Sequence, residues 1–272
     1  MQSLLSQSYP LWECLIIDDG STDGSRDYLA SLRDPRIRVT YHVANQGLSR
    51  SLNEAIDGAR GEFIARMDQD DVNLPDRFRL QVRHLERHPS HQVVGGQILQ
   101  EVDGRKWKYP TSPTSITCRC AFGAPFAHPT VMMRKGIARY RPEFDYAEDW
   151  DLWDRLSVQG VKWANLDAPV LRYRQTLEGM SRAGRPQQRR ARELVSRNIL
   201  GRLGIPVDPC AVDTHLALTQ ADKNSNIKTY HSLIFFMWLQ NTKKKKYPEF
   251  SFLMECAYRT LMVFRGGCRF PL

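Results

Sequence analysis

The sequence lacks the cysteine patterns of zinc-binding and disulfide-rich domains. Its six cysteines are scattered, without a CxxC pair and without a histidine partner at zinc-finger spacing. This distribution indicates neither a zinc site nor a disulfide framework. We therefore expect reduced thiols and a cytoplasmic protein.

Long apolar runs are missing as well. No uninterrupted run approaches the about 20 residues that a membrane-spanning helix needs. Residues 1–13 have neither the basic nor the apolar segment of a signal peptide, so export is not expected. Acidic residues are outnumbered, and the net charge of +9 favours anionic partners such as nucleotides, phospholipid headgroups or nucleic acid, without choosing among them.

What the chain does contain is a regular alternation of apolar runs and helical patterns. The 272 residues, 42% of them hydrophobic, suffice for one full core and a smaller appended region. Apolar runs predict strands at residues 15–17, 37–41, 63–67 and 93–94, and the clearest helices are predicted at residues 48–59 and between Pro75 and Pro89. This order predicts an α/β fold of βαβ units around a mostly parallel central sheet.

The chain changes character towards its end. From Gly95 it is irregular and broken by prolines, before the helical pattern AEDWDLWDRL at residues 147–156. After Val170 the composition shifts to arginine. We predict a first domain over residues 1–175 and a basic helical extension over residues 176–272.

Acidic residues follow two of the predicted strands. Asp18 and Asp19 end the first, and Asp68, Asp70 and Asp71 follow the third. We expect both clusters at one sheet edge, where ligands of open α/β sheets bind. Crowded carboxylates repel one another unless a cation lies between them, and a divalent ion shared with substrate phosphates is the usual solution. For Asp18 and Asp19 an ordinary helix cap is the alternative.

An ordered set of motifs resembles a known family. The segments are SQSYPLWECLIIDDGSTDGS, NQGLSRSLNEAIDGARGEFIARMDQDD, LPDR, HPTVMMR and EDWDLWDRL. Together they cover roughly residues 4–175 and resemble a family 2 glycosyltransferase of the GT-A fold, the bacterial type that builds surface polysaccharides. The resemblance implies an inverting, metal-dependent enzyme that moves a hexose or N-acetylhexosamine from a nucleotide sugar, expected to be UDP-linked, to a saccharide or lipid-linked acceptor.

The resemblance also implies roles for the acidic clusters. It places Asp19 on the uracil ring of the donor, with Asp18 nearby, and Asp68 at the ribose and donor sugar. It places Asp70 on a Mg²⁺ or Mn²⁺ ion that bridges the diphosphate. A bound cation suits this chemistry because the leaving group is a nucleoside diphosphate.

Further residues match the family's motifs. Asn45, Gly47 and Asn53 match a helix-start segment that shapes the nucleotide pocket, although asparagine and glycine also simply favour turns. Asp149 matches the catalytic base that takes the acceptor proton, with Glu148 beside it. The alternative is that Glu148, Asp149 and Asp151 only complement the positive end of a helix.

The roles of the remaining candidates are less specific. His128 matches the acceptor side of the cleft, whereas a lone histidine is more often structural. Arg172 and Arg174 resemble groups near the donor diphosphate or acceptor, although the histidine that often follows them is absent. Trp150 and Trp153 have the helical spacing of core residues and could otherwise stack on a sugar.

The beginning of the chain departs from the family pattern. Family members place another strand and a helix before residue 14, and only the tail of that helix is expected here. Either Met1 is not the natural start, or the chain is a truncated gene product, so a decayed protein without turnover is the alternative function. A sugar nucleotidyltransferase is disfavoured because no glycine-rich phosphate loop is visible near the amino end.

The end of the chain suggests contact with a membrane surface. The run LIFFMWL at residues 233–239 precedes Lys243–Lys246 and an apolar-rich stretch at residues 250–264, a combination that can hold a helix at an anionic bilayer. This would place the protein at the inner face of the cytoplasmic membrane. The alternative is a helical subdomain that packs Phe235 and Trp238 on the core. The arginine-rich residues 182–202 lack interleaved aromatic residues, so no nucleic acid is expected as a partner.

Overall fold

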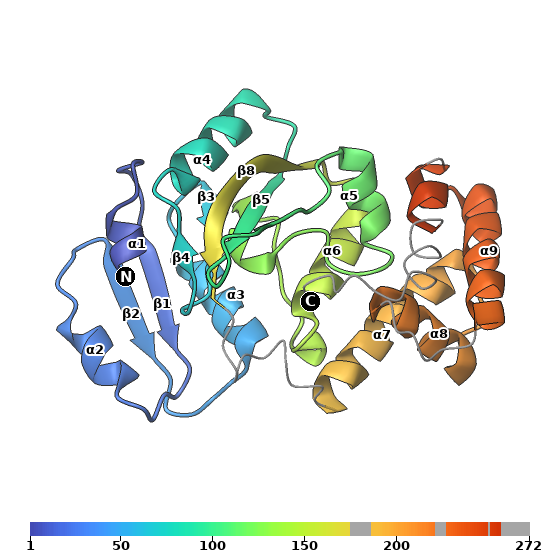
Figure 1. The fold of residues 1–272 in the computed structure, drawn as a ribbon. Coiled ribbons are helices and arrows are strands. Elements are labelled where there is room, and N and C mark those ends of the chain that lie inside the picture. The colour runs from blue at the N-terminus through green and yellow to red at the C-terminus, as the bar shows by residue number, and fades with distance from the viewer. Residues whose placement is uncertain (175–185, 221–226, 250, 257–272) are drawn as a thin grey trace.

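The computed structural model describes residues 1–174, 186–220, 227–249 and 251–256. Figure 1 shows a two-stranded sheet with its helices at one side, a larger sheet in the middle and the C-terminal helices at the other side. Predictions for residues 175–185 and 257–264, and for Cys268, lie outside the described residues. Among the described cysteines, Cys14, Cys118, Cys120 and Cys210 are free thiols.

The first sheet consists of two parallel strands. β1 (Cys14–Asp18) pairs with β2 (Ile37–Tyr41) in register from Cys14 and Ile37 to Asp18 and Tyr41. The short helix α1 (Gln2–Leu5) precedes β1, and α2 (Ser25–Ser31) connects the strands. Both predicted strands are confirmed, and the parallel connection through a helix is the βαβ unit that the pattern predicts.

The second sheet has six strands in the order β3, β7, β5, β8, β4, with β6 on β5. Their bounds are Phe63–Ala65 (β3), Val72–Asn73 (β4), Val93–Gln100 (β5), Lys106–Trp107 (β6), Met132–Arg134 (β7) and Trp163–Tyr173 (β8). β5 and β8 run parallel, whereas the other pairs in this sheet are antiparallel. The predicted parallel pairing holds for β1 with β2 and for β5 with β8, but the expectation of a mostly parallel central sheet is wrong, because the short strands of the six-stranded sheet pair antiparallel.

The expectation that both acidic clusters end strands of the same sheet is wrong. β1 belongs to the two-stranded sheet and β3 to the six-stranded one. β3 pairs with β7, a strand from a distant part of the sequence. Local apolar patterns find strands, but the choice of partner depends on tertiary packing that they do not contain.

Two amphipathic helices connect the sheets to the site. α3 (Leu48–Gly58) and α4 (Arg77–Arg87) confirm the predicted helices. α4 buries Phe78, Val82 and Leu85 against the sheet, which is the apolar stripe that the spacing predicts.

β5 is longer than the apolar pattern at residues 93–94 predicts. Two glycines in the middle of the strand end that pattern, although the strand continues. A Cβ on Gly96 would lie 2.6 Å from a Val170 methyl group on β8, and one on Gly95 would lie 2.2 Å from the Asn165 side chain. The absent side chains therefore allow β5 and β8 to approach closely.

The C-terminal helices pack against two helices from the middle of the chain. α5 (Pro113–Arg119) and α6 (Glu148–Val158) share a buried cluster with α7 (Pro186–Leu203), α8 (Pro209–Gln220) and α9 (Ile227–Lys244). Trp150 of α6 lies in this cluster and Trp153 lies in the neighbouring one, so both tryptophans are core residues. Within the described residues, no helix is both long and apolar enough to cross a membrane.

Candidate functional site

Three acidic side chains meet just after β3. One carboxylate oxygen each from Asp68, Asp70 and Asp71 lies within 4.8 Å of the others. Burial raises the pKa of Asp70, and it raises the pKa of Asp71 to about 7, with the Asp68 charge adding to both shifts. Three hard oxygen ligands in one place suit Mg²⁺ or Mn²⁺.

Asp71 is the member of this cluster to which the motif analysis gave no role. It is 4% exposed. Its Oδ1 accepts a hydrogen bond of 3.0 Å from the backbone N–H of Arg174, whereas its buried Oδ2 has no hydrogen-bond partner. A buried carboxylate oxygen without a donor is costly unless a ligand completes it, which fits a cation at this cluster.

A pocket opens on one side of the cluster. Asp70, Asp71 and Arg174 line it together with Met1–Ser3, which include the start of α1. Arg174 is held beside the cluster by Glu101, with Nε 2.9 Å and Nη2 3.2 Å from the two carboxylate oxygens. Arg172 is exposed on β8, where its backbone pairs with Val72 of β4. Arg172 and Arg174 therefore lie at the pair of strands β4 and β8, next to Asp71, the last residue of the acidic cluster.

A buried arginine connects the cluster with a second group of acids. The Arg66 guanidinium forms an ion pair with Asp68 through Nη1, and its buried Nε has no hydrogen-bond partner among the described residues. Burial raises the pKa of both Glu148 and Asp149, and the Arg66 charge opposes part of that rise. Arg66 is thus a cation shared by the two acidic groups, and sequence reasoning missed it although it lies only two residues before Asp68.

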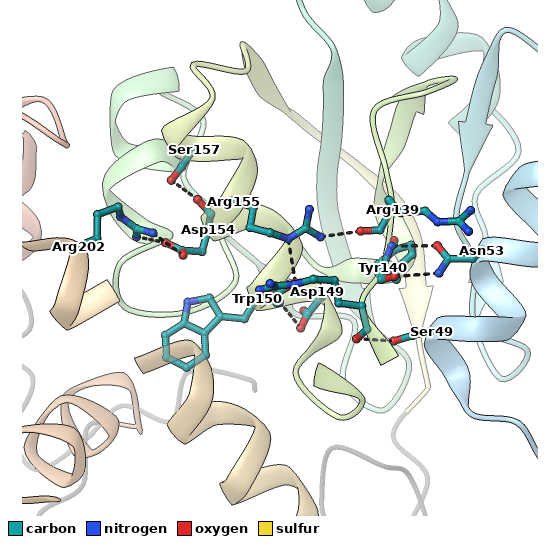
Figure 2. Close-up of polar contacts among 12 residues, drawn as sticks. Ser49, Asn53, Arg139, Tyr140, Asp149, Trp150, Asp154, Arg155, Ser157 and Arg202 are labelled. Atoms are coloured by element: carbon teal, nitrogen blue, oxygen red, sulfur yellow. Dashed lines mark hydrogen bonds and ion pairs between the residues drawn. The ribbon is translucent and has the colours of Figure 1, made fainter. Parts of the chain in front are cut away.

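Glu148 and Asp149 begin α6. In Figure 2, Asp149 is drawn between Ser49 and Asn53 on one side and Arg202 on the other. Burial, followed by the charge of Asp149, raises the pKa of Glu148 to about 8. Burial also raises the pKa of Asp149, against which the Trp150 N–H and Arg66 act. Asp149 Oδ1 accepts the Trp150 N–H at 2.7 Å. Near neutral pH, Glu148 therefore holds a proton, and burial shifts the pKa of Asp149 in the same direction, towards its neutral form.

His128 is buried behind this pair. Its Nε2 lies 2.8 Å from the Tyr140 hydroxyl and its Nδ1 lies 3.7 Å from Glu148 Oε1. Burial, with the nearby Arg66 charge, holds the pKa of His128 well below its usual value. His128 is therefore an uncharged neighbour of Glu148. It lies close to the acidic pair and is only 9% exposed.

Asp19 lies at the start of α3. Its Oδ1 accepts the Gln46 N–H at 2.8 Å, and its Oδ2 accepts the Gly47 N–H at 3.0 Å. Asp18 is 4% exposed and pairs with Arg26 at 2.7 Å. Neither aspartate caps α2, whose N-cap is Gly24, so the helix-cap alternative is not borne out for that helix.

Asn45 and Asn53 play different parts in this region. Asn45 Oδ1 accepts the Gly47 N–H at 3.1 Å and shapes the turn. Asn53 is buried, and its amide exchanges two hydrogen bonds of 2.8 and 2.9 Å with the backbone of Tyr140 (Figure 2). The structure thus places Asn53 as a link between α3 and the segment before α6, with its amide occupied by backbone groups.

Gly47 tolerates no side chain. Its φ is +94°, and a Cβ would lie 2.3 Å from Asp145 Oδ2. Asp145 Oδ1 also accepts the Ser49 N–H at 2.9 Å, and its charge raises the pKa of Glu148. Asp145 therefore connects the turn that holds Asp19 with the acidic pair Glu148 and Asp149 at the start of α6.

We expect Gly47→Ala to lower the free energy of unfolding by about 1–3 kcal/mol, because it adds a clash to a strained φ. Gly104→Ala is the matched control, since Gly104 has a φ of +67° but open space around its Cβ. Urea unfolding measures both variants. An equal loss of unfolding free energy in both variants would show that the neighbouring Asp145 side chain does not require glycine at position 47.

Comparisons with known proteins identify the family of the chain. The family model for glycosyl transferase family 2 matches residues 1–142. EpsE of Bacillus subtilis (strain 168), a protein assigned as a glycosyltransferase, is 35% identical over 195 residues, which cover 67% of this chain and 69% of EpsE. The O-antigen biosynthesis glycosyltransferase WbnJ of Escherichia coli is 31% identical over 188 residues, 64% of this chain and 72% of WbnJ.

The fold comparison points the same way. The crystal structure of S. aureus TarS 1-349 superposes with a TM-score of 0.57 at 16% identity, covering 98% of this chain and 86% of that one. This similarity confirms the predicted GT-A fold. With the family model matching residues 1–142, the chain belongs to glycosyl transferase family 2 and is a glycosyltransferase.

Proposed function

We propose that this enzyme transfers a sugar with inversion from a UDP-sugar to a saccharide or lipid-linked acceptor in cell-surface polysaccharide biosynthesis. The observation that carries the proposal is the pairing of the acidic cluster with the buried Glu148 and Asp149 at the start of α6, with the Arg66 charge acting on both groups. O-antigen synthesis in the name of WbnJ supports the polysaccharide context. A hexose or an N-acetylhexosamine is the expected sugar.

In this proposal Asp149 accepts the proton of the acceptor hydroxyl as its oxygen attacks the anomeric carbon. The hydroxyl has a pKa far above neutrality, so a carboxylate within hydrogen-bond reach is needed. Protonated Glu148 leaves Asp149 as the base of the pair. Attack by one nucleophile with loss of one leaving group inverts the anomeric centre, so an α-linked donor is expected to yield a β-linked product.

Asp70, with Asp68 and Asp71, would hold a Mg²⁺ or Mn²⁺ ion. When bound, such an ion neutralises charge on the departing nucleoside diphosphate. Asp68 is also assigned to the ribose and donor sugar, and Arg174 lies where it can face a diphosphate. Asp19, Asn45 and Gly47 are assigned to the uracil pocket.

Calorimetric titration of the purified chain with UDP, first with Mn²⁺ and then with EDTA, tests the donor assignment. We expect binding that depends on the metal, followed by transfer from one member of a UDP-sugar panel. A folded chain that binds UDP equally with EDTA would contradict the metal assignment. A chain without UDP binding or transfer would favour another nucleotide or a protein without turnover.

A membrane surface is the second partner that we propose. Phe235 and Phe236 are 56% and 48% exposed on α9, about two helical turns before the exposed run Lys243–Lys246. Leu233, Ile234 and Met237 pack into the core instead. The helix therefore docks on the molecule by one face and presents Phe235 and Phe236 to solvent, next to positive charge that suits the anionic inner face of the cytoplasmic membrane.

Replacing Phe235 and Phe236 together by serine is expected to weaken binding to anionic vesicles by about tenfold or more, because each buried phenylalanine contributes about 1.5–3 kcal/mol. Vesicle co-sedimentation measures the effect. Val102→Ser, at a residue that is 84% exposed elsewhere, is the matched control. Equal binding of the parent to neutral and anionic vesicles would contradict the role of the lysines.

A further inference from the structure

We propose that His42 is a positioning residue that links Glu54 on α3 to Asp19 and thereby orients Asp19 for the nucleobase. His42 follows β2 directly and is 7% exposed. Its Nδ1 lies 2.7 Å from Asp19 Oδ1, and its Nε2 lies 2.8 Å from Glu54 Oε2. The inference rests on the proposed function, which assigns Asp19 to the uracil ring.

The two contacts determine the charge of the imidazole. An ionised carboxylate only accepts hydrogen bonds, and a neutral imidazole has only one N–H to donate. Because both ring nitrogens of His42 face carboxylates, both contacts form together only when the ring is doubly protonated. Hydrogen bonds to Asp19 and then to Glu54 raise the pKa of His42 against the opposing effect of burial.

The link leaves room on Asp19 for a ligand. Oδ1 receives His42 Nδ1 and the Gln46 N–H, whereas Oδ2 receives the Gly47 N–H. A carboxylate oxygen can accept two hydrogen bonds. Among the described contacts, Oδ2 therefore keeps one acceptor position, which suits the imide N–H of a uracil ring.

The backbone of His42 is held independently of its ring. The His42 N–H donates to the Asp18 carbonyl oxygen at 2.8 Å, and the Arg26 guanidinium of α2 donates to the His42 carbonyl oxygen. The charged groups around His42 come from three elements. They are Asp18 at the end of β1, Asp19 directly after it, Arg26 from α2 and Glu54 from α3. Loss of the ring proton breaks the link from Asp19 to Glu54 while the strand ends stay in place.

The pH dependence follows from the raised pKa of His42. Below this pKa the ring donates to both carboxylates. As the pH rises through it, one contact loses its hydrogen, Asp19 is less firmly held, and UDP affinity is expected to fall by about tenfold. Glu54→Gln removes one of the two charges that raise the pKa of His42, so the fall in UDP affinity should move to lower pH.

Two measurements test the link. Calorimetry gives the Kd of UDP with Mn²⁺ between about pH 6 and 9 for the parent, Glu54→Gln and the control Asp57→Asn, whose exposed side chain on the same helix pairs with Arg139. NMR titration gives the pKa of the His42 ring without nucleotide. We expect a raised pKa in the parent and in Asp57→Asn, and a lower pKa with a shifted binding profile in Glu54→Gln.

The outcomes separate this inference from the proposed function. A parent that binds no UDP at any pH overturns the proposed function, and the positioning role with it. If the parent binds UDP, an ordinary pKa for His42, or a Glu54→Gln profile that matches the Asp57→Asn profile, overturns the inference alone. A purely structural role for His42 would change stability in Glu54→Gln without moving the pH profile of Kd.

Discussion

Replacing Asp149 with asparagine is expected to lower kcat by about 10²–10⁴-fold, the usual contribution of a general base. UDP binding should persist, because Asp149 lies at the start of α6, whereas the nucleotide is assigned to Asp19 and the turn with Asn45 and Gly47. Asparagine can still accept the Trp150 N–H that Asp149 Oδ1 receives at 2.7 Å. Because burial raises the pKa of Asp149, the neutral variant should unfold at the same or a higher temperature.

The measurement is single-turnover transfer, with Tm and UDP binding recorded for the same samples. Asp213→Asn is the matched control, since the Asp213 side chain is 58% exposed on α8. In the parent, kcat should rise with pH as Asp149 loses its proton. A parent-like rate in Asp149→Asn would assign the base to another group, and Glu148→Gln is then the variant to measure.

Replacing Asp70 with asparagine is expected to lower kcat by about 10²–10⁴-fold and to remove the metal dependence of UDP binding. A cation at a developing negative charge contributes several kcal/mol to the transition state, and each 1.36 kcal/mol is tenfold in rate. Asp68 and Asp71 would then be left as two ligands of a weakened site.

Titration with Mn²⁺, in the presence and absence of UDP, measures this effect directly. Asp103→Asn is the control, because Asp103 lies in an exposed turn where Oδ1 accepts the Arg105 N–H. Unchanged Mn²⁺ affinity in Asp70→Asn would show that the three carboxylates do not form the cation site. Restored activity at high Mn²⁺ would support a weakened site over a misfolded one.

Much of the local structure could be predicted from the sequence. The α3 and α4 patterns carry strong helical periodicity, and the structure confirms both helices. β5 was predicted too short because Gly95 and Gly96 interrupt its apolar run, although they are what lets it approach β8. The separation into two sheets was missed because β3 finds its partner in β7, far along the chain.

The candidate site was predictable where its residues are neighbours in sequence. Asp68 and Asp70 form one motif, and the structure brings them together with Asp71. Arg66 and His42 were missed because each acts on groups that only the fold places beside it. For such residues, the sequence offers no signal beyond a charged side chain at the end of a strand.

Two consecutive residues of α6 have different surroundings. Asp149 belongs to the acidic pair, whereas Trp150 is 3% exposed in the cluster shared with α7, α8 and α9, with Arg192 of α7 over its ring at 5.6 Å. A chain cut after Tyr173 would keep every assigned site residue except Arg174, yet it would uncover the indole next to the proposed base. The C-terminal helices are therefore a poor point for domain exchange between related enzymes, because the helix that carries the base needs them as its hydrophobic backing.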